Sequence, residues 1–187
     1  MGKRLLDLLL LIIASLLLGI PFIIIYFLVK LTSPGPAIHW SKRVGRKNSF
    51  FLMPKFRTMS LSTPQVATHL LSDSSNYLTP IGKLLRQTSL DEIPQLWSVL
   101  KSDMSFVGPR PALFNQDDLV ELRTSSNIDD LVPGITGWAQ INGRDNISIP
   151  EKVKLDLYYY QHKNLFFDIK ILFLTLFNVF FQKNITH

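Results

Sequence analysis

Two adjacent carboxylates, Asp91 and Glu92, are the strongest candidates for chemistry in the sequence, where they lie in the segment Thr88-Ser-Leu-Asp-Glu-Ile-Pro94. We expect a helix over residues 90–101, with both side chains in its first turn. A carboxylate held there as an anion lies near free N–H groups, and it could attack phosphorus where those groups receive phosphate oxygens. The alternative is structural, because Ser89 and Glu92 have the S-x-x-E spacing of a capping box. The spacing alone leaves both interpretations open.

Positively charged residues occur in turn-like segments on both sides of this carboxylate pair. Each one taken singly is more often a solvated surface charge, but several together indicate an anionic ligand that carries phosphate. Arg110 lies between Pro109 and Pro111, whose rings restrict the backbone and would present the guanidinium in a fixed direction. The candidate ligand-binding residues are Lys55, Arg57, Arg86, Arg110, Asn142 and Arg144.

The composition fits one folded domain and excludes several kinds of site. The chain has 187 residues, of which 47% are hydrophobic and 18% charged, so it is not a disordered segment. It has no cysteine, which excludes a disulfide scaffold, a thiolate nucleophile and cysteine-ligated zinc or iron–sulfur sites. The four histidines lack paired-ligand spacing, and the chain has no Walker A, G-x-G-x-x-G, H-E-x-x-H or G-x-S-x-G motif.

The net charge of +6 is unevenly distributed along the chain. Residues 1–60 contain nine of the 20 Lys and Arg residues but only one acid, Asp7. A nucleic-acid-binding protein would be expected to be basic throughout, whereas an N-terminal region that meets anionic lipid head groups would show this asymmetry. We therefore expect membrane lipid as a partner and no nucleic acid.

An apolar segment near the N-terminus predicts association with a membrane. The 22 residues from Leu8 to Val29 carry no charge and are long enough, as a helix, to cross a hydrocarbon layer of about 30 Å. The segment is too long for a signal peptide, and no suitable cleavage site follows it. Pro21 lies inside the segment and predicts a kink or break near residues 19–21.

Basic residues flank both ends of the apolar segment, namely Lys3 and Arg4 before it and Lys30, Lys42, Arg43, Arg46 and Lys47 after it. Flanks of this kind assign both ends to the cytoplasm, which suits a re-entrant hairpin that enters and leaves the membrane by one face. The alternative is a Pro-kinked transmembrane helix with its N-terminus outside. In both topologies the remaining chain is cytoplasmic, because the heavier basic flank follows the segment.

The chain after the apolar segment is expected to be a helix-rich α/β domain. Short apolar segments at 37–40 and 50–53 predict two strands around a basic turn, and the polar residues 60–78 predict a loop. Helical patterns follow at about 80–86, 90–101, 112–123 and 150–163. The last of these opens with Ser148-Ile-Pro-Glu151, which has capping-box spacing and a proline in the first turn.

The C-terminal segment, about residues 164–182, is almost wholly apolar but carries a narrow polar stripe. The stripe comprises Asn164, Asp168, Thr175, Asn178 and Gln182. A helix with this pattern suits the membrane interface, or packing against the N-terminal segment, better than it suits crossing a membrane alone. A buried core helix is the alternative.

Eight motifs, in order, make the chain similar to the bacterial sugar transferase family, whose monotopic phosphoglycosyl transferases begin glycan assembly on a polyprenyl carrier. The resemblance extends from Lys3 to about Lys170. The motifs are Lys3-Arg-Leu-Leu-Asp7, Leu31-Thr-Ser-Pro-Gly-Pro36, Arg43-Val-Gly-Arg46, Lys55-Phe-Arg-Thr-Met59, Thr79-Pro-Ile-Gly-Lys83, Thr88-Ser-Leu-Asp-Glu-Ile-Pro-Gln-Leu96, Val107-Gly-Pro-Arg-Pro111 and Pro133-Gly-Ile-Thr-Gly-Trp-Ala-Gln-Ile-Asn-Gly-Arg144.

The resemblance implies a reaction and roles for particular residues. A nucleotide-activated sugar, usually a UDP-sugar, donates sugar 1-phosphate to polyprenyl phosphate, and UMP is released. Asp91 matches the family's nucleophile, Glu92 matches the adjacent glutamate, and Mg²⁺ is associated with that aspartate and the donor diphosphate. The family's N-terminal helix is re-entrant and broken at a Ser-Pro pair, whereas Ile20 precedes Pro21 in this chain.

The sequence therefore predicts a membrane anchor over residues 1–31 and a catalytic domain over 32–187 that ends in an interfacial helix. The domain is expected on the cytoplasmic face of the bacterial inner membrane, bound to a UDP-sugar, polyprenyl phosphate and Mg²⁺. A homo-oligomer is left open, and so are the sugar and the glycan pathway. The rival hypothesis is a noncatalytic membrane adaptor that binds anionic lipid, in which Asp91 and Glu92 only cap a helix.

Overall fold

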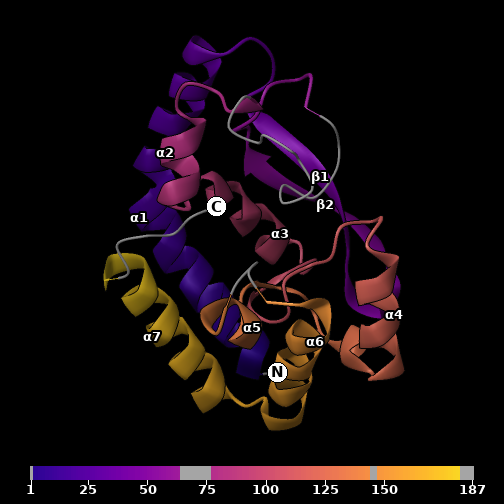
Figure 1. Cartoon of the computed structure of the whole chain (residues 1–187). Helices are drawn as coiled ribbons and strands as arrows, with labels where there is room; N and C mark the ends of the chain where they lie inside the picture. Colours follow the sequence, from indigo (N-terminus) through magenta and orange to yellow (C-terminus); the bar gives the residue numbers. More distant parts are fainter. Residues whose placement is uncertain (1, 64–76, 144–146, 182–187) are drawn as a thin grey trace.

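The computed structural model describes residues 2–63, 77–143 and 147–181, and it has the expected helix-rich α/β fold. Two small sheets lie among the helices: an antiparallel pair, β1–β2, and a parallel pair, β3–β4. The long helix α1 lies along one side of the molecule, and the hairpin and helix α4 lie on the other side (Figure 1). Most of the predicted loop at 60–78 lies outside the described residues.

Strands β1 (Ile38–Val44) and β2 (Phe50–Phe56) form the predicted hairpin, with Val44 opposite Phe50 next to the turn. Lys47 and Asn48 take up positive φ in that turn. The hairpin extends from the end of α1 towards α4 (Figure 1). At its far end Arg43 donates a hydrogen bond to the carbonyl of Pro111 at 3.3 Å. The basic residues of the turn therefore lie at the end of the hairpin that is distant from α1.

The parallel pair joins β3 (Ser105–Val107) to β4 (Gly134–Thr136), two three-residue strands that the sequence pattern did not predict. They approach so closely that a Cβ atom on Gly134 would lie 2.1 Å from the backbone nitrogen of Gly108. Glycine is therefore required at this crossing, because any side chain would push the strands apart. The pairing places the loop that follows β3, residues 108–111, in the interior of the domain.

The predicted helices are present, with shifted ends. The helix expected at 90–101 consists of a 3₁₀ segment and a short α-helix, because Pro94 lacks the N–H that a continuous helix needs. The helix expected from 112 begins five residues later, at Asp117. Helix α6 opens with the predicted capping box between Ser148 and Glu151. The helical elements described between the hairpin and α7 are α2 (Gly82–Gln87), η4 (Leu90–Gln95), α3 (Leu96–Leu100), α4 (Asp117–Ser125), η5 (Ile128–Asp130), α5 (Trp138–Ile141) and α6 (Ile149–His162).

Helix α1 (Gly2–Thr32) runs through Pro21 without interruption, so of the kink or break expected near residues 19–21 the structure shows no break. A proline inside a helix leaves the carbonyl four residues earlier, here that of Leu17, without its usual N–H donor, and this loss bends helices without ending them. The axis of α1 changes direction part-way along its length in Figure 1. Among the described residues, α1 is the one helix long and apolar enough to cross a membrane.

Both ends of α1 are held by the rest of the chain. At the N-terminal end, the Lys3 ammonium lies 2.8 Å from a carboxylate oxygen of Asp168, and Arg4 donates to the carbonyl of Val99 at 2.7 Å. At the other end, the guanidinium of Arg57 donates to the carbonyl and the hydroxyl of Ser33. The two basic residues that were expected to flank the membrane segment therefore make tertiary contacts.

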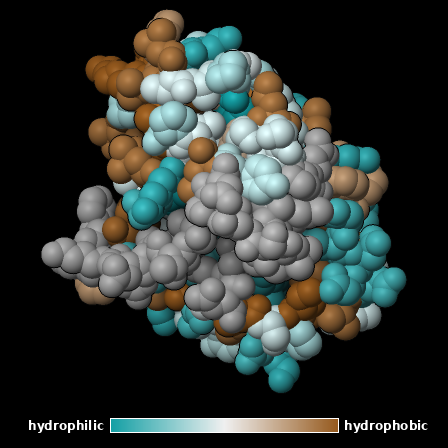
Figure 2. Space-filling view, turned by 45° about the horizontal axis from the view of Figure 1, so that its top comes forward, coloured by the Kyte–Doolittle hydropathy of each residue, from teal (hydrophilic) through white to brown (hydrophobic). Residues whose placement is uncertain are grey.

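The apolar surface of α1 is divided between the core and the outside. Leu11, Ile25 and Val29 are buried in two hydrophobic clusters of the domain. The opposite side of the helix is exposed, as shown by Leu16 at 78% and Ile20 at 72% exposure. Figure 2 shows hydrophobic side chains gathered along this edge of the molecule. Such a large exposed apolar surface indicates contact with a membrane or a partner.

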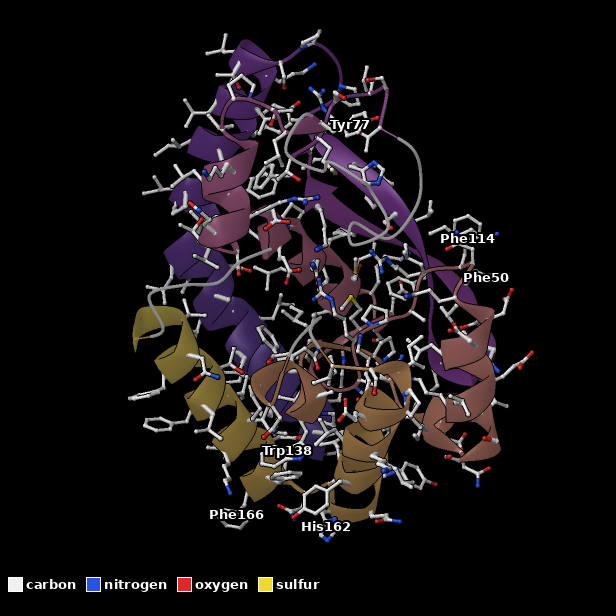
Figure 3. The ribbon with its side chains drawn as sticks, viewed as in Figure 1. Phe50, Tyr77, Phe114, Trp138, His162 and Phe166 are labelled. Carbon is white, nitrogen blue, oxygen red and sulfur yellow. The ribbon has the colours of Figure 1, made fainter. Side chains whose placement is uncertain are left out.

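Helix α7 (Leu165–Phe181) is oriented with its polar stripe towards the protein. Asp168 is buried and accepts a hydrogen bond from the hydroxyl of Tyr159 at 2.7 Å, and the hydroxyls of Thr175 and Thr136 lie 2.7 Å apart. Phe166 is 86% exposed and points outward at the start of the helix (Figure 3). The interpretation of α7 as a buried core helix is therefore wrong.

Replacing Asp7 should destabilise the protein, because this buried carboxylate ties α1 to β3. It accepts hydrogen bonds from the Ser105 hydroxyl at 2.9 Å and from the Phe106 N–H at 3.0 Å. We expect Asp7→Ala to lower the free energy of unfolding by about 1–3 kcal/mol, the usual cost of leaving a buried donor unpaired. Denaturant unfolding in detergent measures this change. An Asp7→Ala protein as stable as the wild type would show that the contact does not secure the helix.

Candidate active site

Four separate elements bring charged side chains together at the carboxylate pair. Segment η4 carries Asp91 and Glu92, and the end of β2, which packs against η4, carries Lys55. Arg110 comes from the loop after β3, and Arg86 comes from α2, next to η4. The cluster therefore depends on the hairpin, the parallel strand pair and α2 being assembled around one short segment.

Ser89 does not cap the segment that carries the carboxylate pair. It has a left-handed conformation, with φ of 56°, and its side chain makes no capping hydrogen bond. Glu92 instead lies 2.6 Å from the ammonium of Lys55 and 2.9 Å from the guanidinium of Arg110. The capping-box interpretation is therefore wrong at Ser89, although the same spacing does form a capping box at Ser148.

The charge of Glu92 is balanced by two cations. Burial opposes ionisation of this carboxyl, but Arg110 and Lys55 outweigh burial and hold the pKa of Glu92 well below its ordinary value. Glu92 is thus an anion over the physiological pH range. Its two salt bridges also fix the directions of the Lys55 and Arg110 side chains.

Asp91 has a different environment from its neighbour. Burial raises the pKa of Asp91, the nearby charge of Glu92 adds to this effect, and Lys55, Arg110 and Arg86 oppose it. Its ion pair with Lys55 is long, at 3.8 Å. Two adjacent carboxylates therefore differ: Glu92 is engaged by short salt bridges, while Asp91 is a more basic carboxylate that lies near cations without a short bond to them.

Comparison with known proteins decides the family. The sequence profile described as bacterial sugar transferase matches residues 1–182. This chain belongs to the bacterial sugar transferase family. The resemblance seen in the eight motifs is thereby confirmed.

Relatives in the sugar transferase family match nearly the whole chain. An uncharacterized sugar transferase, EpsL, of Bacillus subtilis is 41% identical over 98% of this chain and 89% of its own length. The UDP-glucose:undecaprenyl-phosphate glucose-1-phosphate transferase of Escherichia coli is 39% identical over 97% of this chain. An undecaprenyl-phosphate N-acetylgalactosaminephosphotransferase of Aeromonas hydrophila is 35% identical over 93% of this chain. The chain spans only 40% and 42% of the last two relatives.

Not all of the predicted ligand-binding residues of this sugar transferase lie at the carboxylate pair. Arg57 is buried and is bound to Ser33 and to the carbonyl of Pro36, so it holds the turn after α1 instead. Asn142 donates to the carbonyl of Trp138 at 2.7 Å and closes α5. Arg144 lies outside the described residues. The structure thus assembles Lys55, Arg86 and Arg110, and it gives Arg57 and Asn142 other contacts.

The sequence interpretation missed residues that hold Arg86 and Arg110 in place beside the carboxylate pair. Thr58 accepts a hydrogen bond from Arg86 at 3.0 Å. Arg123, on α4, donates to the carbonyl of Arg110 at 2.9 Å and pairs with Asp156. Thr58 lies within the recognised motif Lys55-Phe-Arg-Thr-Met59, but Arg123 lies within an ordinary amphipathic pattern. Only its burial, at 8% exposure, distinguishes Arg123 from a surface arginine.

Proposed function

We propose that this chain transfers sugar 1-phosphate from a UDP-sugar to polyprenyl phosphate, giving polyprenyl diphosphate sugar and UMP. The observation that carries the proposal is the unequal environment of the carboxylate pair. The negative charge of Glu92 is balanced by its salt bridges to Lys55 and Arg110. Asp91 lies beside the same cations, but burial raises its pKa. A more basic carboxylate is a better nucleophile, and the adjacent cations would receive the anionic donor.

The reaction would proceed in two displacements at one phosphorus atom. A carboxylate oxygen of Asp91 attacks the β-phosphorus of the donor, the bond from that phosphorus to the bridging oxygen breaks, and UMP leaves with the electron pair. An oxygen of polyprenyl phosphate then attacks the aspartyl phosphosugar and returns Asp91 as a free carboxylate. Arg110 and Arg86 would offset charge on the transferring group.

Mg²⁺ fits this site as a shared ion of protein and substrate. Within the described residues, no group of three or more His, Asp and Glu side chains could hold a metal alone. Mg²⁺ commonly binds through one or two carboxylates together with substrate phosphates, so Asp91 and the donor diphosphate would suffice. When bound, the ion would offset negative charge on the diphosphate.

The exposed surface of α1 and α7 would place the reaction at a membrane. Contacts at Lys3 and at Ser33 hold both ends of α1 on the same domain, so a straight crossing of the bilayer would break one of the two. We therefore propose a monotopic arrangement on the cytoplasmic face, with α1 entering and leaving by that face. A lipid phosphate at head-group depth could then reach Asp91.

The function is tested by measuring UMP release from purified protein with polyprenyl phosphate, Mg²⁺ and a panel of UDP-sugars. We expect release with one or a few donors: at most one UMP per protein molecule from the donor alone, and repeated turnover when the lipid acceptor is present. The adaptor hypothesis predicts no release with any donor. Its structural premise, a cap made by Ser89, is already absent.

The monotopic arrangement predicts that the N-terminus is cytoplasmic. The chain has no cysteine, so one cysteine added at the N-terminus and, separately, Asp117→Cys on exposed α4 give clean labelling sites. Neither should react with a membrane-impermeant maleimide in intact cells, and both should react after lysis. Pro21→Leu restores the missing N–H and should shift some molecules to a transmembrane topology with lower activity.

Labelling of the wild-type N-terminus from outside would contradict the monotopic arrangement and support the kinked transmembrane helix. Exposed Leu16→Ile serves as the matched control for Pro21→Leu, because it changes the same helix without changing its hydrogen bonds. It should label like the wild type.

A further inference from the structure

The loop at residues 108–111 is held largely through its carbonyl groups. Pro109 and Pro111 have no N–H, so the backbone of this loop offers few donors. The N–H of Gly108 donates to the carbonyl of Thr136 at 2.8 Å, and the residues after it are held through their acceptors. The carbonyl of Pro109 accepts from the N–H of Gly134 at 2.9 Å. The carbonyl of Arg110 accepts from the guanidinium of Arg123 at 2.9 Å. The direction in which Arg110 projects therefore depends on the side chain of Arg123, which lies on helix α4.

Arg123 is itself held by a buried carboxylate. Its Nε and Nη2 atoms donate to one oxygen of Asp156 at 3.0 and 2.6 Å, and Asp156 is only 1% exposed. The remaining nitrogen, Nη1, makes the bond to Arg110. A guanidinium is planar and rigid, so fixing one edge on Asp156 fixes the direction of the other.

We propose that Arg123, oriented by Asp156, is a positioning residue that holds the Arg110 backbone so that the Arg110 guanidinium reaches Glu92 and the donor phosphates. This inference rests on the proposed phosphosugar transfer. The Arg110 guanidinium lies 2.9 Å from Glu92, and a shift of its backbone would move it from that place. If the Arg123–Asp156 pair only tied α4 to α6, a change that kept the pair would leave catalysis unaffected.

Arg123→Lys separates these two roles. Lysine keeps the charge that Asp156 needs in the interior, but it lacks the planar fork that reaches a second acceptor in a fixed direction. We expect kcat and kcat/KM to fall together by about 10- to 100-fold, as for the loss of a contact made in the transition state. The melting temperature in detergent should stay close to that of the wild type.

The decisive measurement is a double-mutant cycle with Arg110→Gln. Because Arg123 is proposed to act through Arg110, Arg123→Lys should lower activity by no more than about twofold when Arg110 is already replaced. A general weakening of the fold would lower activity by the same factor in both backgrounds. Thr124→Ala is the control, because Thr124 lies next to Arg123 on the exposed side of α4 and bonds to Asn48. It should retain wild-type activity.

A second variant tests the same inference if Arg123→Lys folds poorly. Arg123→Gln combined with Asp156→Asn replaces the buried ion pair by a neutral pair, and it should show the same loss and the same dependence on Arg110. Wild-type turnover in folded Arg123→Lys, or an equal loss in both Arg110 backgrounds, would overturn the inference while UMP release by the wild type upholds the proposed function. A wild type that releases no UMP would overturn the proposed function itself.

Discussion

Asp91→Asn is expected to abolish turnover, with a loss of more than about 10³-fold, while the protein remains folded. An amide cannot form the aspartyl phosphosugar, although it has nearly the same volume as the carboxylate. The stability should be unchanged or slightly increased. Burial raises the pKa of Asp91 in the folded state, so above that pKa its ionised form opposes folding, and asparagine removes this charge.

Two measurements check this expectation. UMP release reports turnover, and intact-protein mass spectrometry after incubation with the donor alone should show a sugar phosphate on the wild type and none on Asp91→Asn. Asp117→Asn, at an exposed site on α4, is the matched control and should behave like the wild type. Glu92→Gln should differ by losing stability as well, because it leaves Lys55 and Arg110 without their carboxylate. Wild-type turnover by Asp91→Asn would exclude Asp91 as the nucleophile.

Removal of Mg²⁺ is expected to reduce activity to background. Three cations, Lys55, Arg86 and Arg110, act on two carboxylates, so the site has one positive charge in excess. The diphosphate of the donor would bring about two negative charges close to Asp91. The protein side chains cannot balance that charge, and a divalent cation can.

The measurement is UMP release in excess chelator, followed by addition of excess Mg²⁺ to restore it. The melting temperature without donor should not change with chelator, because Asp91 alone is a weak site for the ion. Undiminished turnover in chelator would refute the requirement. A fall in melting temperature without donor would instead indicate a structural metal.

The sequence predicted well those features that depend on neighbouring residues. The 22 uncharged residues of the apolar segment form a helix, the two apolar segments around a basic turn form a hairpin, and Ser148 caps α6. The polar stripe of α7 was also visible, because a helical period orders residues that are close in sequence. Even the adjacent carboxylates were recognised by their local setting.

Predictions from the local sequence pattern were wrong where residues far apart in the chain bind the same side chain. Ser89 has the spacing of a cap, but the carboxylate of Glu92 is taken by Lys55 and Arg110, 37 and 18 residues away. Arg57 has the appearance of a phosphate-binding residue, but Ser33 and the carbonyl of Pro36 take its donors. A salt bridge to a buried carboxylate is worth more than a marginal cap, so the tertiary contact prevails.

By itself the sequence determined a helix-rich member of the sugar transferase family, with an apolar helix long enough to cross a membrane and a candidate carboxylate pair, because motifs and periodicity are properties of the chain. Only the tertiary structure decided which side of α7 faces the protein and that the pKa values of Asp91 and Glu92 shift in opposite directions. It also decided that Arg123 binds the carbonyl of Arg110. These outcomes depend on burial and on contacts between elements far apart in sequence, and burial sets both the pKa values of the carboxylates and the partners of each arginine.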